Sequence, residues 1–206
     1  MLFMQSNPFN GFIRQYRLRK LAKSVRAGIV PKDATREQVF EALRYTRPKG
    51  ALEMFGILSA RHFDGLGKLK ADLGLVGVRL VTREFADLLV DGMCSSGAAA
   101  LIDDFTAHEM GDGSTAEASG DQSLVAPADG RNIGTQTHGA TSNIFKSIAT
   151  ITATSAYTVI EHGIFNQSSV TGDYLLDRTI LGTPFVVAVD DEVEWTYELT
   201  VNTETG

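Results

Sequence analysis

The chain of 206 residues is 43% hydrophobic and 21% charged, which is enough for one domain with an appendage or for two small domains. Its single cysteine, Cys94, excludes an internal disulfide and a paired-cysteine zinc site, and no apolar run approaches the ~20 residues of a membrane helix. The N-terminus also lacks the apolar core of a signal peptide, so we expect a protein kept in the cytosol unless it leaves as part of something larger.

The net charge of −6 combines two segments of opposite sign. Residues 1–50 carry 11 Lys and Arg against 3 Asp and Glu, whereas residues 84–206 carry 3 against 19, so the segments have net charges of +8 and −16. This asymmetry predicts that the two segments meet, within one chain or between copies, or that the basic segment faces an acidic partner. The alternative is two separately solvated surfaces.

Residues 1–50 are predicted to form a basic helical arm. A first helix begins at Asn7-Pro8 and ends before Gly28 and Pro31. Its apolar stripe consists of Leu18, Leu21, Ala22, Val25 and Ile29. Its basic residues are our candidates for partner binding: Arg14, Arg17, Arg19, Lys20, Lys23 and Arg26. An ordinary packed helix with a solvated basic face is the alternative. Nucleic-acid or membrane binding by this helix is only weakly indicated, because no aromatic residues interleave with the basic ones and no DNA-binding motif is present.

A second helix of the arm is marked by a capping box, with Thr35 at the N-cap and Gln38 reaching back to it. It should turn Val39, Phe40 and Leu43 inward and end before Pro48. The two helices together carry too little apolar surface to be stable alone. We therefore expect the arm to dock on the rest of the chain or on another chain.

Residues 51–206 are predicted to form a mainly β domain, an antiparallel β-sandwich of jelly-roll-like type. The clearest strand covers residues 192–202, where five apolar residues alternate with polar ones and leave an acidic outer face. The other predicted strands cover residues 55–62, 68–71, 76–81, 101–108, 144–154, 156–165, 174–181 and 184–189.

Two features interrupt these strands. A short helix near residues 83–93 is predicted to begin after Thr82 as N-cap and to end near Gly92. Its inner face should hold Phe85, Leu88, Leu89 and Met93. Residues 111–142 are rich in small and polar residues and predict a long loop, which would be an arm to a neighbouring copy or, in an enzyme, a lid.

The residues show no constellation that predicts catalysis. The four histidines, His62, His108, His138 and His162, lack metal-ligand spacing, and no motif for a nucleophilic serine or for phosphate binding is present. The adjacent acids Asp103 and Asp104 would point to opposite faces of a strand and could not share a cleft. We therefore expect no enzymatic activity, no catalytic residues, no metal and no cofactor.

One polar pair stands out inside the apolar strands. Glu161 interrupts the strand at 156–165, and Arg178 interrupts the next strand at 174–181. If these strands pair across the intervening turn, we expect Glu161 to meet Arg178 in a partly buried charged hydrogen bond. We interpret the pair as a structural pin for strand register, because no nucleophile or metal motif lies nearby.

The segments TVIEHGIF at residues 158–165, LLDRT at 175–179 and EWTYELTVN at 194–202 resemble a family of tailed-bacteriophage virion structural proteins. The segment at residues 108–127 and the GTQT and SNIFK segments within residues 134–146 are similar to that family as well. The resemblance covers about residues 101–206 and does not extend to the arm.

The resemblance implies a virion component assembled in the host cytoplasm. We expect a capsid decoration (cement) protein that binds the major capsid shell through its arm, as a homotrimer or another homo-oligomer. Other virion positions, such as head-to-tail connector, collar or tail, are the first alternative. A nucleic-acid-binding module and a carbohydrate-binding or hydrolytic sandwich are further alternatives, although Trp195 and a few tyrosines are too few to build an aromatic groove.

Overall fold

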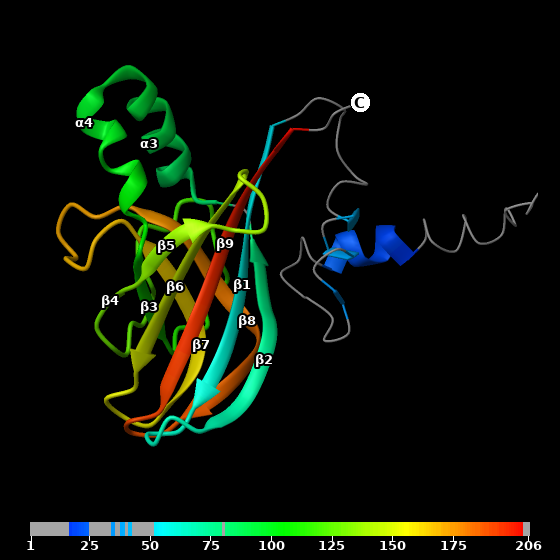
Figure 1. Cartoon of the computed structure of the whole chain (residues 1–206), viewed down its shortest axis with the longest axis vertical. Helices are drawn as coiled ribbons and strands as arrows, with labels where there is room; N and C mark the ends of the chain where they lie inside the picture. The colour runs from blue at the N-terminus through cyan, green and yellow to red at the C-terminus, as the bar shows by residue number, and fades with distance from the viewer. Residues whose placement is uncertain are drawn as a thin grey trace, which may run out of the picture.

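The computed structural model describes residues 17–24, 34–35, 38–39, 41–42, 52–79 and 81–203. Their main body is a sandwich of two antiparallel sheets (Figure 1). The larger sheet has the order β2-β1-β9-β6-β5, and the smaller sheet has the order β4-β3-β7-β8. The prediction of a mainly β antiparallel sandwich is therefore confirmed.

The strands of the larger sheet are β1 (Leu52–Phe63), β2 (Leu69–Arg79), β5 (Thr135–His138), β6 (Ile144–Thr152) and β9 (Glu192–Thr203). Those of the smaller sheet are β3 (Ala107–Gly111), β4 (Asn132–Ile133), β7 (Tyr157–Phe165) and β8 (Leu175–Val187). Three short helical segments connect β2 to β3: α3 (Arg83–Cys94), α4 (Ser96–Ala99) and the 3₁₀ helix η1 (Ile102–Asp104).

Strand β9 is the centre of the larger sheet, between β1 and β6. Its alternation is as predicted over residues 193–199, because Val193, Trp195, Tyr197 and Leu199 all lie in the core between the two sheets. At the end of the strand the prediction is wrong, since Thr200 is buried and Val201 is 38% exposed. The acidic outer face is partly neutralised by neighbouring strands. Arg61 on β1 donates to Glu194 at 3.0 Å, and Lys146 on β6 lies opposite Glu198 in the strand register.

Two predicted pairs of strands are single strands in the structure. The predicted break at Gly74 is a register shift inside β2, where Gly74 has φ +57°. The predicted break before Pro184 lies inside β8. Proline is tolerated there because β8 is an edge strand and its residues 181–184 fall at a register shift where they have no partner on β7.

Helix α3 begins as predicted, because the Thr82 hydroxyl accepts the N–H of Phe85 at 3.1 Å. The prediction for Met93 is wrong, since its side chain is 88% exposed on the last turn. Helix α3 continues two residues past Gly92, where a side chain would overlap Ile102. The strand predicted at residues 101–108 is also wrong: η1 comes first, and β3 begins only at Ala107.

The two sheets also approach each other at one side, where the edges of β2 and β8 meet. Arg79 on β2 donates to the carbonyl of Ile180 on β8 at 2.9 Å. Gly77 lies against Thr179 so closely that a side chain on Gly77 would overlap it. This seam between β2 and β8 is closed by side chains, because the two strands are not neighbours in either hydrogen-bonded sheet.

The described part of the arm packs on the outer face of the larger sheet. Val39 lies in one cluster with Phe55, Ile57 and Val78, and all four residues are buried. Phe55 and Ile57 belong to β1 and Val78 belongs to β2. The capping box is confirmed: Thr35 N–H donates to Gln38 Oε1 at 3.0 Å, and Gln38 N–H donates to Thr35 Oγ1 at 3.3 Å.

Candidate functional site

The structure brings together the two residues that the sequence singled out as a polar pair. Arg178 Nε donates to Glu161 Oε2 at 2.7 Å, and both side chains are almost completely buried. Strands β7 and β8 pair so that Gly163 lies opposite Arg178 and Glu161 lies opposite Ile180, which places the pair on a diagonal. The pair is therefore a cross-strand contact, as expected from the predicted pairing.

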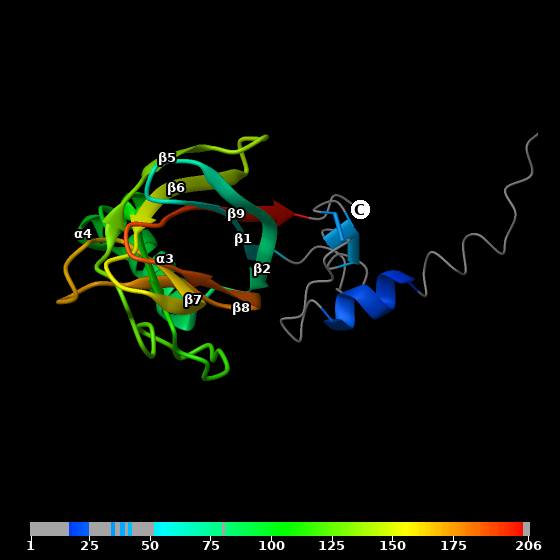
Figure 2. The same ribbon diagram turned by 90° about the horizontal axis from the view of Figure 1, so that it is seen from below.

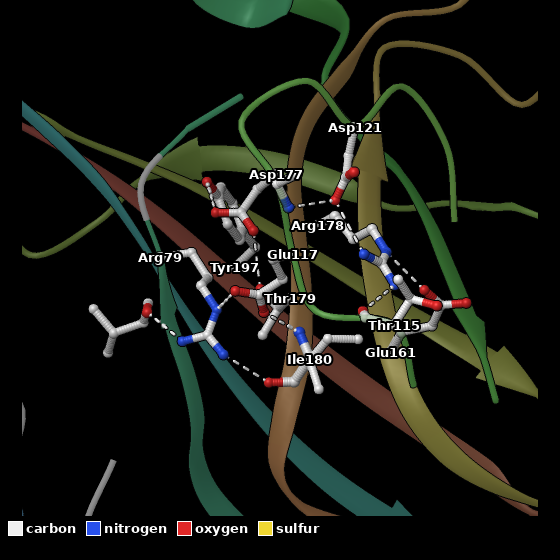
Figure 3. A network of polar contacts seen from close by, with 12 residues as sticks. Arg79, Thr115, Glu117, Asp121, Glu161, Asp177, Arg178, Thr179, Ile180 and Tyr197 are labelled. Atoms are coloured by element: carbon white, nitrogen blue, oxygen red, sulfur yellow. Dashed lines mark hydrogen bonds and ion pairs between the residues drawn. The ribbon is translucent and has the colours of Figure 1, made fainter. Parts of the chain in front are cut away.

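Both partners of this pair also hold the segment at residues 112–131. Glu161 accepts backbone N–H groups from Ala126 at 2.7 Å and Val125 at 3.2 Å. Arg178 donates to the Asp121 carboxylate and to the carbonyl of Thr115, each at 3.0 Å (Figure 3). This segment buries the pair from solvent by lying over β7 and β8 (Figure 2).

Four more contacts fix residues 112–131 along their length. Glu117 forms an ion pair with Arg79 and accepts the backbone N–H of Ile180 (Figure 3). Asp129 accepts the hydroxyl of Thr154 at 2.6 Å and that of Tyr157. The long loop predicted near 111–142 is present as an irregular segment at residues 112–131, whereas β4 and β5 occupy part of the rest of that range. The contacts of this segment with β2 and β8 argue against a free arm or a mobile lid.

A second buried acid, Asp177, lies beside the seam between β2 and β8. Its carboxylate accepts the Thr179 hydroxyl at 2.9 Å and the Tyr197 hydroxyl at 3.2 Å. Burial raises the pKa of Asp177 to about 7, although these hydrogen bonds and Arg79 oppose the rise. Burial and the nearby Asp177 also raise the pKa of Tyr197.

A chain of hydrogen-bonding side chains crosses the core between the sheets. His108 Nδ1 lies 3.0 Å from His162 Nε2, and His108 Nε2 lies 2.9 Å from Ser147 Oγ. Burial lowers the pKa of His108 to about 3, and burial together with His108 lowers that of His162. A serine next to a histidine is the pattern of a nucleophile and its base, but all three side chains are buried without access for a substrate.

Two further charged centres hold turns in place. Arg131 pairs with Glu109 at 3.2 Å and with Asp173 at 2.8 Å, and its guanidinium lies 3.4 Å from the centre of the Phe165 ring. Asp191 contacts His62 at 2.8 Å and Lys70 at 2.7 Å. Burial alone would raise the pKa of Asp191, but hydrogen bonds from the Ala188 N–H, Lys70 and His62 lower it to about 2.

The predicted partner-binding residues lie on the arm. In the helix at residues 17–24, the side chains of Arg17, Arg19, Lys20 and Lys23 are exposed, whereas Leu18 and Ala22 are buried. Arg14 and Arg26 lie outside the described residues. The exposure of the basic residues and the burial of the apolar ones agree with the predicted amphipathic pattern. The exposed basic residues form a ridge on the outer side of the helix.

The described residues line two open hollows on the surface that have charged or apolar walls. One of about 450 Å³ lies beside α3, bounded by its acids Glu84, Asp87 and Asp91 and by residues of the 112–131 segment. The other, of about 590 Å³, lies at the end of the larger sheet, where Phe145, Val201 and His138 contribute to its walls. Neither hollow contains the buried polar groups of Arg178, Arg131 or His108.

Within the described ranges, no group of three or more His, Cys, Asp and Glu side chains could hold a metal ion. No helix among those residues is both long and apolar enough to cross a bilayer. The buried polar groups of Arg178, Arg131 and His108 connect segments of the β domain. Among the described residues, accessible charged features include the basic ridge of residues 17–24 and the acidic side of α3.

Sequence reasoning missed most partners of Arg178 and Arg79. Asp121 and Thr115 lie about sixty positions from Arg178, and Glu117 lies in a segment that was interpreted as a free loop. One signal was available: Arg131, Lys146 and Arg178 are the only basic residues in the acidic region 84–206, so a basic residue there indicates a local need for positive charge. Comparison of the chain with family models, curated proteins and solved structures finds no match.

Proposed function

We propose that this chain is a non-enzymatic structural protein of a tailed-phage virion, a capsid decoration (cement) protein that binds the major capsid shell or neighbouring subunits through its arm. The observation that carries the proposal is the basic ridge of Arg17, Arg19, Lys20 and Lys23, which is held outward by the buried face of the same helix. A rigid, exposed row of cations suits binding to an acidic protein surface.

The β domain supports a structural role for a physical reason. Arg178 and Arg131 each form ion pairs with two carboxylates, and these ion pairs connect loops to strands. A site for catalysis needs its reacting groups within reach of a substrate, and these groups are covered by the protein itself. Their arrangement suits a domain that keeps one shape within an array.

The direct test is cryo-electron microscopy of particles from cells that express this chain. We expect density for the sandwich on the head, with the helix at residues 17–24 against the shell or against a neighbouring subunit. Density at the head-to-tail junction, the collar or the tail would move the protein to that position. Absence of the chain from purified particles would overturn the proposal.

A biochemical test uses the arm. Reversing the charges of Arg14, Arg17, Arg19 and Lys20 should weaken binding to purified shells, and raising the salt concentration should weaken the wild-type chain in the same way. Normal shell binding by the reversed variant would show that the arm is not the anchor.

A further inference from the structure

Helix α3 presents a face that no described segment of the chain covers. Val90 is 60% exposed and Met93 is 88% exposed, although both are large apolar residues on a helix of 12 residues. Asp87 and Asp91 are exposed beside them, one helical turn apart. The 450 Å³ hollow adjoins Asp87 and Asp91, with Arg83 and half-buried Glu84 also in its wall, and its lining does not include Val90 or Met93.

The basic ridge on residues 17–24 is complementary to this face. Arg17, Lys20 and Lys23 recur every third residue, and the acids of α3 at Glu84, Asp87 and Asp91 recur every third or fourth residue. Both spacings keep the charges on one side of their helix. The segment 17–24 contains no acidic residue, so its own net charge is strongly positive.

These two surfaces lie on opposite sides of one molecule. The helix at residues 17–24 lies beside β1 and β2, whereas α3 and α4 project from the far end of the sandwich, and both views agree on this separation (Figures 1 and 2). A contact between the two surfaces within one chain would require the arm to leave the cluster of Val39 with Phe55, Ile57 and Val78.

We propose that the exposed face of α3 is the docking surface for the basic helix of a second copy of this chain. The methylene stems of Lys20 and Lys23 cover Val90 and Met93, while their ammonium groups reach Asp87 and Asp91. Two different surfaces meet in such a contact, so the association is head-to-tail and produces a ring or a row of copies. The inference rests on the proposed function, because it names the neighbour that the arm binds.

The experiment is a charge exchange followed by sedimentation velocity over a range of protein concentrations. One variant carries Lys20→Glu and Lys23→Glu, a second carries Asp87→Lys and Asp91→Lys, and a third carries all four changes. A control with Lys68→Glu and Lys146→Glu reverses two basic charges of the β domain elsewhere. Circular dichroism confirms that each variant is folded.

We expect the wild-type chain and the control to self-associate, and each two-residue variant to raise the dissociation constant at least about tenfold. The four-residue variant should regain association, because its charges are again opposite. Association of the wild-type chain should weaken as salt rises.

A wild-type chain that stays monomeric at every concentration would overturn the inference. So would two-residue variants that associate normally, or a four-residue variant that does not recover. Particle binding is measured in parallel: a chain that binds particles but never itself disproves the self-docking and leaves the virion function standing. A chain that self-associates but is absent from particles disproves the function alone.

Discussion

Arg178 is held by two carboxylates and a backbone carbonyl, while Glu161 is held by Arg178 and two backbone N–H groups. Removing either side chain leaves the other charge buried without its main partner. A buried charge that loses its partner costs several kcal/mol, more than the pair itself contributes relative to apolar residues. The two residues should therefore be energetically coupled.

We expect Glu161→Gln and Arg178→Met each to lower the free energy of unfolding by roughly 3 kcal/mol. The double variant should lose clearly less than the sum of the two, because neither charge is then left alone. Urea unfolding of the four proteins at one pH measures this coupling. Strictly additive losses would show that the two side chains do not interact.

Because of Asp177, we expect the stability of the fold to decrease as the pH rises. Its pKa is about 7 in the fold, against an ordinary value of 3.8, so the folded state holds this proton more tightly than the unfolded state. The resulting stabilisation is complete below about pH 4 and is lost as the pH rises to about 7. Asp177→Asn mimics the protonated acid and should be more stable than wild type at pH 8 by a few kcal/mol, with little difference at pH 4. Equal stability at both pH values would contradict this.

The buried His108 and His162 make the stability of the fold change with pH in the opposite direction. Both stay neutral in the core, with the pKa of His108 near 3, whereas histidines in the unfolded chain take up protons near pH 6.5. Their contribution to stability is complete above pH 6.5 and is lost as the pH falls towards 3. In the Asp177→Asn background, we expect the free energy of unfolding to decrease steadily over that range, measured by urea titration at each pH. A flat profile there would mean that the histidines titrate normally in the fold.

The segment at residues 112–131 is anchored to strands of both sheets and is not a free loop. Its anchors are Arg79 and Arg178, which both come from strands. We expect limited proteolysis to spare this segment in the wild-type protein and to cut it in Arg178→Met. Arg61→Met is the matched control, since it removes an exposed ion pair with Glu194. Equally rapid cleavage of the wild-type segment would show that the anchors do not hold it.

Elements with a local signal were predicted from the sequence, and elements with distant determinants were not. The alternation of β9, the Thr82 cap and the Thr35 capping box depend on residues a few positions apart. Gly74 and Pro184 were interpreted as breaks because their effect depends on a bulge and on an edge position, which only the sheet order reveals.

The contacts of the candidate site also fall into those that the sequence predicted and those that it did not. The contact of Glu161 with Arg178 follows from adjacent strands joined by one turn, so the sequence predicted it. The contact of Arg79 with Glu117 joins β2 to an irregular segment that shows no periodicity, so no pattern pointed to it. Met93 was assigned to the core because it continues an apolar stripe, but the sheets do not extend beneath the last turn of α3 (Figure 1).

At the scale of the whole molecule, the arm completes the surface of the larger sheet. Phe55, Ile57 and Val78 face outward from the sandwich and are buried with Val39 over them. Deleting residues 1–50 should therefore leave a folded β domain with an exposed apolar patch. We expect the truncated domain to keep its circular dichroism spectrum, to aggregate at lower concentration in light scattering and to lose incorporation into particles.

A point substitution separates these effects from loss of the basic residues. Val39→Asp places a charge in the apolar contact and should release the arm, whereas Lys23→Asp changes an exposed position and should not. Crosslinking or hydrogen exchange of β1 and β2 measures the release. Unchanged protection of those strands in Val39→Asp would show that the arm does not depend on this contact.

The seam between β2 and β8 affects aggregation, because it covers two strand edges that could otherwise pair with another chain. A sandwich ordinarily offers its outermost strands to any other chain with free N–H and C=O groups, and this is the usual route to irreversible fibrous aggregates. Here the edges of two long strands, of 11 and 13 residues, face each other and are locked by Arg79 and Thr179. At this side, another copy of the chain would therefore meet side chains and not free backbone groups, and contacts between side chains form and dissolve reversibly.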